Sequence, residues 1–396
     1  MTPPSGPPAV PHRGAHPAKV KRVLGLVPLD AGLCRDVWRG VLSYGKARLD
    51  WQLHFLHPSA RLDRLTFQPS GVILTTQMPE MVKWLRQHRP PVVNVFGQPG
   101  ITGPVVDVDN AAVGRLGAQH FLERGFEHFG FVGAAGVAWS QQRESAFREA
   151  VGAMGRAVHV FQHRHGISGF QDEALDPRLV EWLKGLPKPV AVMACEDVTA
   201  WRVIEHSRGL GVRVPDDVAV LGVDDDEIWC ESSHPAVSSI AIPAFQMGAK
   251  AAQWLDQVMN GRRPDEPAVL FAPAGVVTRA STDMLAVPDV ELGAALRFIQ
   301  ENVDKDINVD SVAEAASMTR RTLERRFQTV MRQTVLERIT QVRVERAKRL
   351  LRNTDLSLGQ ISNRCGFRRP ERFSTVFRRE CGESPSEYRR KFFKSL

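Results

Sequence analysis

The chain has 396 residues, of which 43% are hydrophobic, and it carries a formal net charge of +8. This length suits two or three domains, and the composition is that of a globular protein rather than a disordered one. No apolar run reaches the length of a transmembrane helix and the first residues lack the apolar core of a signal peptide, so we expect no membrane partner, no signal peptide and a cytoplasmic, nucleoid-associated location.

Residues 1–19 are rich in Pro, Gly and His and are predicted to form a disordered tail. The five cysteines are far apart and form no C-x-x-C pair, so we expect reduced thiols in a cytosolic protein. They are Cys34, Cys195, Cys230, Cys365 and Cys381.

Short runs rich in Val and Ile alternate with helical periodicity from residue 19 to residue 96. The predicted strands are residues 19–27, 51–56, 71–75 and 91–96, and the predicted helices are residues 35–48 and 78–87. Strand–helix alternation of this kind is typical of a parallel sheet with helices on both faces. We therefore expect a first α/β lobe.

The alternation begins again at residue 105. The predicted strands are residues 105–108, 128–132, 158–162, 190–194 and 218–223, and the predicted helices are residues 112–124, 141–154, 176–186 and 198–208. A return segment follows, with a helix at 244–260 and strands near 239–241 and 268–277. These patterns predict two doubly wound parallel-sheet lobes over residues 20–283, a hinged two-lobe receptor with its ligand at the carboxyl ends of the strands between the lobes.

Residues 290–396, after a predicted linker at 284–289, read as an all-α domain with two helix-turn-helix units. In the first unit Thr319 is expected to cap a helix that turns Leu323, Phe327 and Val330 inward. In the second unit Gly366 provides the turn. Residues 288–396 hold about 23 Lys and Arg against about 15 Asp and Glu, so nearly all the net charge belongs to this domain, as DNA binding requires.

Two family resemblances follow from these residues. The series Ala347, Leu350, Leu351, Ile361, Gly366, Phe367, Phe373, Phe377, Gly382, Pro385, Tyr388 and Arg389 resembles the signature of the AraC/XylS transcription regulators. Residues 106–133, 139–147, 193–200 and 214–228 resemble the LacI/GalR sugar-sensing domain, which implies a periplasmic-binding-protein-like fold for residues 20–283. Arg368, Arg369 and Arg372 depart from the usual AraC/XylS residues at the start of the second recognition helix, which makes the target sequence hard to infer.

The resemblances imply a sugar-responsive, sequence-specific transcription regulator that is not an enzyme and needs no cofactor. They imply double-stranded DNA with tandem half-sites, RNA polymerase and a second copy of the chain, in a homodimer, as partners. The implied effector is a small sugar, D-xylose or a similar aldose, and the implied output is activation of sugar-catabolism genes. A purine or another metabolite as effector, and action as a repressor, stay open as alternatives.

A sugar needs ionised acceptors and a planar donor, because each hydroxyl can donate to a carboxylate and accept from a guanidinium. We expect the ligand contacts at ends of strands, at the lobe crossover and at the start of a helix. They are Asp30, Asp109, Trp139, Arg143, Asp197 and Asp224. An aspartate after a strand can instead cap a helix, and Arg143 can instead form an ion pair within its lobe.

Other polar residues are expected to lie in solvent. Asp217, Asp225 and Asp226 are predicted to be solvated, and the metal-like spacing of His163 and His165 lacks further ligands nearby, which favours a surface loop and no metal site.

For DNA contact we expect the first turns of the two recognition helices to supply the side chains, with arginine to guanine as the commonest specific contact. They are Thr319, Arg320, Arg321, Thr322 and Arg325 in the first helix, and Arg368, Arg369, Glu371 and Arg372 in the second.

Enzyme classes fit poorly. A dinucleotide-dependent dehydrogenase needs a Gly-rich loop after its first strand, which residues 27–33 lack. A DNA-repair methyltransferase needs clustered cysteines for zinc and an activated thiol, and the cysteines here are scattered. A transport receptor is disfavoured by the DNA-binding domain.

Overall fold

The computed structural model describes residues 20–48, 50–57, 60–76, 79–164, 176–284, 290–331, 333–354 and 356–393. The predicted tail at 1–19, His165 and nearly all of the predicted linker lie outside these ranges. The chain divides into two compact units, Met1–Asp107 with Ala244–Val269, and Val108–Pro243 with Leu270–Leu396. Within the described ranges, no helix has the length and apolar character needed to cross a bilayer.

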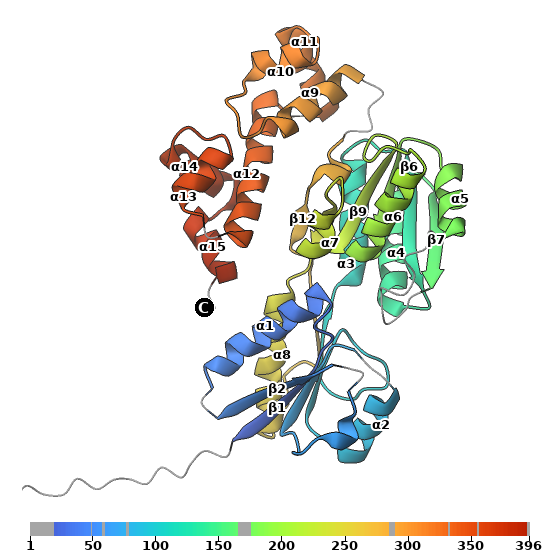
Figure 1. Cartoon of the computed structure of the whole chain (residues 1–396), viewed down its shortest axis with the longest axis vertical. Coiled ribbons are helices and arrows are strands. Elements are labelled where there is room, and N and C mark those ends of the chain that lie inside the picture. The colour runs from blue at the N-terminus through green and yellow to red at the C-terminus, as the bar shows by residue number, and fades with distance from the viewer. Residues whose placement is uncertain are drawn as a thin grey trace, which may run out of the picture. The chain divides into compact units, whose positions relative to one another are not determined.

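The first unit is built on a six-stranded sheet with the order β11-β5-β4-β3-β1-β2 (Figure 1). The strands from β2 through β1, β3 and β4 to β5 pair in parallel in that order, with β2 at one edge. The strands are β1 (Lys21–Leu26), β2 (Trp51–Leu56), β3 (Gly71–Leu74), β4 (Val92–Val95), β5 (Val105–Val108) and β11 (Ala268–Phe271). The helical elements are α1 (Gly32–Lys46), η1 (Leu62–Arg64), α2 (Pro79–His88) and α8 (Ala244–Met259).

Helices α1 and α8 lie side by side against this sheet, so the predicted return of the late segment to the first lobe is confirmed (Figure 1). Two glycines let the helix backbones approach closely. A Cβ added at Gly40 would lie 2.0 Å from the carbonyl oxygen of Phe245, and one at Gly248 would lie 1.8 Å from that of Val37. A larger residue at either position would force the helices apart.

The second sheet has the order β12-β10-β9-β8-β6-β7 and is parallel except for its last strand, β12, which pairs antiparallel with β10. Its strands are β6 (His128–Ala135), β7 (Val158–Arg164), β8 (Val190–Ala194), β9 (Val218–Asp224), β10 (Ser238–Ala241) and β12 (Gly275–Val277). The helical elements are α3 (Asn110–Leu122), α4 (Ala138–Gly152), α5 (Pro177–Gly185), α6 (Asp197–Gly209), α7 (Glu227–Ser232) and η2 (Ala280–Thr282).

One predicted strand is wrong. The apolar run at 268–277 forms two strands in different sheets, β11 in the first and β12 in the second. Pro273 lies between them and cannot donate a ladder hydrogen bond, and Gly275 adopts a φ of +121° that only glycine takes easily. The backbone therefore turns where the apolar pattern continues.

The C-terminal helices enclose two small cores. Leu292, Ile299, Val312, Leu323 and Phe327 are buried in one, and Ala347, Ile361, Phe367, Phe373 and Phe377 in the other. The elements are α9 (Val290–Glu301), α10 (Val309–Ala315), α11 (Arg320–Arg326), the π-helix η3 (Phe327–Met331), α12 (Val335–Asn353), α13 (Leu358–Arg364), α14 (Pro370–Cys381) and α15 (Pro385–Phe393). Helix α12 contributes to both cores, as the predicted link between two helix-turn-helix units should.

The predicted inward orientation of Val330 is wrong, because its side chain is 40% exposed. The α-helical hydrogen bonds of α11 give way to a π-helix at Phe327. A π-turn holds more residues than the 3.6 of an α-turn, so the stripe formed by Leu323 and Phe327 does not continue to Val330.

Candidate functional site

Asp224 stands at the carboxyl end of β9 in a strained conformation. Its φ is +109°, in a region that non-glycine residues rarely occupy, and the next residue, Asp225, has a φ of +56°. The Oδ1 atom of Asp224 is buried and has no hydrogen-bond partner among the described residues. A strained backbone that presents an unsatisfied carboxylate oxygen is typical of a functional site.

The charge state of Asp224 is set by its surroundings. Burial raises the pKa of Asp224 to about 7, the guanidinium of Arg143 opposes that shift, and the carboxylates of Glu196 and Asp226 add to it. The acid therefore titrates near neutrality.

Arg143 points at this carboxylate from helix α4. Its side chain is buried, and its Nη2 lies 3.9 Å from Asp224 Oδ1, which is too far for a hydrogen bond. The Nε group donates to Asn110 Oδ1 at 2.9 Å, and Nη1 donates to the carbonyl oxygen of Cys195. These contacts fix the guanidinium plane and leave its outer edge facing Asp224.

Trp139 covers the same guanidinium. Helix α4 begins at Ala138, three residues earlier than predicted, so Trp139 and Arg143 are one turn apart on one helix. The Arg143 guanidinium carbon is 4.9 Å from the centroid of the Trp139 ring. The half-buried indole thereby stabilises the cation and adds an apolar surface beside it.

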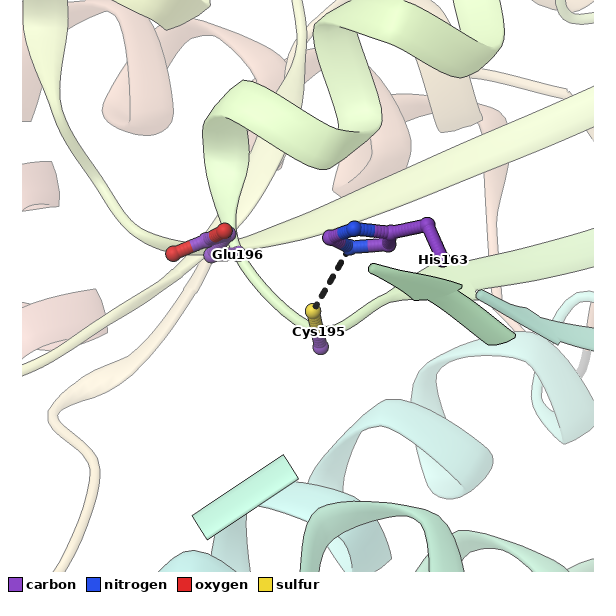
Figure 2. A group of neighbouring side chains, drawn as sticks. All are labelled: His163, Cys195 and Glu196. Atoms are coloured by element: carbon purple, nitrogen blue, oxygen red, sulfur yellow. Dashed lines mark hydrogen bonds between the residues drawn. The ribbon is translucent and has the colours of Figure 1, made fainter. Parts of the chain in front are cut away.

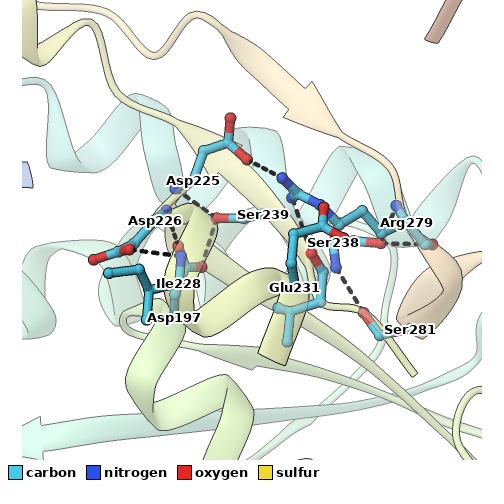
Figure 3. Close-up of polar contacts among 10 residues, drawn as sticks. Asp197, Asp225, Asp226, Ile228, Glu231, Ser238, Ser239, Arg279 and Ser281 are labelled. Atoms are coloured by element: carbon cyan, nitrogen blue, oxygen red, sulfur yellow. Dashed lines mark hydrogen bonds and ion pairs between the residues drawn. The ribbon is translucent and has the colours of Figure 1, made fainter. Parts of the chain in front are cut away.

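Both carboxylate oxygens of Asp197 accept hydrogen bonds (Figure 3). Asp197 is the first residue of α6 and accepts hydrogen bonds from the Ser239 hydroxyl at 2.6 Å and from the Asp226 amide at 2.8 Å. Burial, and then the neighbouring Asp224, raise the pKa of Asp197 well above its ordinary value. The residue therefore ties α6 to β10 and to the loop after β9.

The expectation that Asp225 is solvated is wrong, because it forms a buried ion pair with Arg279 (Figure 3). Asp225 receives a hydrogen bond from Arg279 Nη2 at 2.7 Å, and Asp226 caps α7 by accepting from the amide of Ile228. Arg279 is 2% exposed and also donates to Glu231 Oε1 at 2.8 Å. This network holds the strained turn after β9 in place.

The other two predicted ligand residues have different surroundings. Asp109 caps α3, where its side chain accepts a hydrogen bond from the amide of Ala112 at 2.7 Å. Asp30 belongs to the first unit, its side chain is exposed, and its Oδ1 lies 3.9 Å from Nε2 of His57. The second unit thus brings together Trp139, Arg143, Asp197 and Asp224.

The surface-loop expectation for His163 is also wrong. His163 lies on β7, and its Nε2 is 3.2 Å from the hydroxyl of Thr199 on α6. Burial raises the pKa of the adjacent Cys195 thiol to about 12.

In the C-terminal domain Thr319 caps α11, as predicted, by accepting from the amide of Thr322. Two predicted DNA-contact arginines are paired within the domain. Arg320 binds Glu324 and Asp310, and Arg368 binds Asp306.

Four exposed arginines have no such pairing. The guanidinium groups of Arg321, Arg325, Arg369 and Arg372 form no hydrogen bond or ion pair with any described residue. Glu371 is likewise exposed beside Arg372. Burial, and then the positive charge of Arg372, lower the pKa of Arg343. Unneutralised arginines on recognition helices are what phosphate and base contacts require.

Comparisons with known proteins agree with this architecture. Residues 118–282 match the family model described as a periplasmic binding protein-like domain, and residues 312–391 match a helix-turn-helix domain. The xylose operon regulatory protein of Escherichia coli strain K12 is 30% identical over 367 residues, covering 90% of this chain and 93% of its own length. The protein of that name from Haemophilus influenzae strain Rd is 26% identical, with coverages of 90% and 94%.

Solved structures give the same result. The structure of the xylose-binding transcription activator xylR matches with a TM-score of 0.62 at 28% identity, covering 94% of this chain and 98% of its own. A complex of the transcriptional regulator CelR with cellobiose matches 67% of this chain and 86% of its own with a TM-score of 0.54 at 21% identity, which concerns the fold alone.

Proposed function

This chain belongs to the family of xylose operon regulatory proteins, DNA-binding transcription regulators and not enzymes, and we propose that its effector is D-xylose or a similar aldose. We propose a ligand-sensing domain over residues 20–283, a linker at 284–289 and a DNA-binding domain over residues 290–396. The output is activation of sugar-catabolism genes by a cytoplasmic homodimer that contacts RNA polymerase.

The single observation that carries the sugar proposal is the unsatisfied Oδ1 of Asp224 opposite Arg143. A hydroxyl oxygen placed between them donates its proton to the carboxylate and accepts from Nη2 of the guanidinium. Both bonds are charge-assisted, and a polyol supplies such hydroxyls in a fixed stereochemical arrangement. Trp139 offers its ring to the apolar face of the sugar.

The remaining predicted ligand residues take different roles in this proposal. Asp197 positions the loop that carries Asp224, because its own oxygens are engaged. Asp109 caps α3 and thereby orients it. The first residue of that helix, Asn110, accepts a hydrogen bond from Arg143. The exposed Asp30 of the first unit stays a predicted ligand contact.

DNA contact is assigned to the two helix-turn-helix units, with α11 and α14 as recognition helices. Arg321, Arg325, Arg369 and Arg372 contact bases or phosphates of two neighbouring major-groove segments, about one helical turn apart. Thr319, Thr322 and Glu371 lie in the same first turns and complete the surface. Arg320 and Arg368 act less directly, because acidic neighbours already neutralise them.

Coupling between the two functions follows from linkage. A sugar that binds one arrangement of the chain more tightly than another shifts the population toward it, and DNA affinity changes by the corresponding factor. Sugar binding at Asp224 acts on the strained turn that follows this residue. The buried Arg279 links that turn to β10 and to the residues just after β12.

The test is calorimetric titration of the purified full-length protein with a panel of pentoses, hexoses and purines, D-xylose first. Saturable binding that distinguishes D-xylose from its epimers supports the proposal. Absence of heat with every sugar, from protein shown to be folded by circular dichroism, overturns the effector assignment and leaves the DNA-binding role in place.

A further inference from the structure

Three side chains of different chemistry converge beside the ligand site (Figure 2). They are His163 of β7, Cys195 directly after β8, and Glu196 at the start of α6. One atom from each residue, an imidazole nitrogen, the thiol sulfur and a carboxylate oxygen, lies within 4.8 Å of the other two. Nothing in the comparisons assigns a role to this group.

The sheet creates the convergence. Strand β6 lies between β7 and β8, and its residue in register with His163 is Ala134. The small Ala134 side chain leaves room for the imidazole to reach across to Cys195, whose Sγ is 4.0 Å from Nε2 of His163. Residues 163 and 195 are separated by 31 residues of chain, so only the parallel order of the strands brings them together.

We propose that His163, Cys195 and Glu196 bind a thiophilic divalent cation, Zn²⁺. Imidazole nitrogen, thiolate sulfur and carboxylate oxygen are the ligand types that zinc takes in proteins, whereas Mg²⁺ and Ca²⁺ prefer oxygen alone. Three protein ligands leave a fourth tetrahedral position for water or for an oxygen of another molecule. The thiol releases its proton to solvent as the zinc–sulfur bond forms.

The distances fit after a small movement. Zinc bonds of about 2.3 Å to sulfur and about 2.0–2.1 Å to nitrogen, at a tetrahedral angle, place the two donors about 3.6 Å apart. The observed separation of Sγ and Nε2 is 4.0 Å, so a shift of a few tenths of an ångström brings both into range. A rotation of the half-buried Glu196 side chain completes the set.

The charges also fit. A thiolate and a carboxylate neutralise the two charges of the cation, and the neutral imidazole adds none. The Thr199 hydroxyl lies 3.2 Å from Nε2 of His163 and 3.4 Å from Oε1 of Glu196, so it stands between two of the proposed ligands, and zinc would replace its hydrogen bond to Nε2.

The first experiment uses full-length protein stripped with a chelator and then titrated with Co²⁺, which reports thiolate and tetrahedral coordination in its absorption spectrum. We expect one equivalent of Co²⁺ to produce a sulfur-to-cobalt charge-transfer band, and Zn²⁺ to abolish the band by displacement. Cys195→Ser and His163→Gln should each weaken binding on the order of 100-fold or more, and Glu196→Gln should weaken it measurably.

Matched controls come from the same chain. His159 is exposed on the same strand four residues before His163, and Cys34 is a buried thiol of the first unit. His159→Gln and Cys34→Ser should keep the band and the affinity. Circular dichroism shows whether each variant is folded, and the exposed His159 and half-buried Glu196 give folded comparisons even if Cys195→Ser does not fold.

Three results would overturn the proposal. They are the absence of a charge-transfer band in the folded parent protein, persistence of the band in folded Cys195→Ser, and an equal loss of affinity in His159→Gln and His163→Gln. The titration contains neither sugar nor DNA, so its outcome is independent of the proposed effector and of the proposed DNA contacts.

Discussion

Arg279 and Asp225 form a buried ion pair across 54 residues of sequence, with Nη2 of the arginine 2.7 Å from Oδ1 of the aspartate. The arginine side chain is 2% exposed and the aspartate side chain 12% exposed. Because Asp225 directly follows the strained Asp224, this pair anchors the turn that presents the unsatisfied carboxylate.

Replacing Arg279 with methionine should therefore destabilise the second unit. The change leaves Asp225 and Glu231 without their shared cation, and an uncompensated buried charge typically costs about 3–5 kcal/mol. Urea denaturation followed by fluorescence measures the loss. Arg178→Met is the control, because Arg178 pairs with Asp176 at an exposed position and should change the midpoint little. Equal effects of the two changes would contradict a special role for Arg279.

Arg143→Ala should abolish detectable sugar binding, and Arg143→Lys should weaken it strongly, because lysine cannot reproduce the planar fork that serves Asn110, Cys195 and a ligand together. Loss of one partner of a buried charged hydrogen bond costs about 2–5 kcal/mol of binding. Titration calorimetry with the effector gives the affinity. Arg148→Ala, at an exposed position on the same helix, should bind like the parent protein. Unchanged affinity in Arg143→Ala would refute the site.

Asp224→Asn should lose effector affinity and gain stability at alkaline pH. The folded-state pKa of Asp224 is about 7, against about 3.9 in the unfolded chain. The unfolded state binds fewer protons between these values, so stability falls as pH rises through that window, and the full penalty applies above pH 7. Asparagine carries no ionisable group at this position, so the variant lacks this penalty.

The gain should therefore be small at pH 4 and on the order of 4 kcal/mol at pH 8, and chemical denaturation can be compared at the two pH values. A gain of the same size at pH 4 and pH 8 would show that titration of Asp224 is not its cause.

Strand-end reasoning predicted which polar residues lie near one another in the second unit, and it did so for a physical reason. Parallel strands end at one edge of their sheet, so Asp224 at the end of β9 and Asp197 after β8 had to be neighbours. The same rule could not predict that the Ser239 hydroxyl and the Asp226 amide donate hydrogen bonds to Asp197, because those partners depend on the loop conformation.

Contacts between residues far apart in the sequence could not be predicted for a similar reason. A buried arginine such as Arg279 follows an ordinary strand and carries no local signal of burial. The sequence favoured a surface loop without a metal at His163, because its spatial neighbours Cys195 and Glu196 are supplied by another strand and helix. In the C-terminal domain the caps and turns are local, which is why Thr319 and Gly366 were predicted correctly and Val330, which depends on the π-helix, was not.

Arg321→Ala and Arg369→Ala should each weaken operator binding about tenfold or more, without changing effector affinity, because both guanidinium groups are exposed and unneutralised. Arg320→Ala should have a smaller effect, since Glu324 and Asp310 already pair with that side chain.

Binding isotherms at several salt concentrations separate the kinds of contact. Removing an arginine that contacts a phosphate lowers the salt dependence of DNA affinity. Removing one that contacts a base relaxes the preference for the operator sequence. An Arg320→Ala defect as large as that of Arg321→Ala would contradict the assignment.

Gly366→Ala should destabilise the second helix-turn-helix unit more than Gly382→Ala does. Both glycines have left-handed backbone, with φ of +70° and +76°, so both substitutions carry the same conformational cost of about 1–2 kcal/mol. The two positions differ in the room available for a Cβ atom. A Cβ at Gly366 would lie 2.3 Å from the carbonyl oxygen of Val303, whereas one at Gly382 would meet nothing within 4 Å. Overpacking should therefore add about 1–3 kcal/mol at Gly366 alone. Thermal denaturation of the two variants measures this difference directly, and equal melting temperatures would show that the contact with Val303 relaxes without cost.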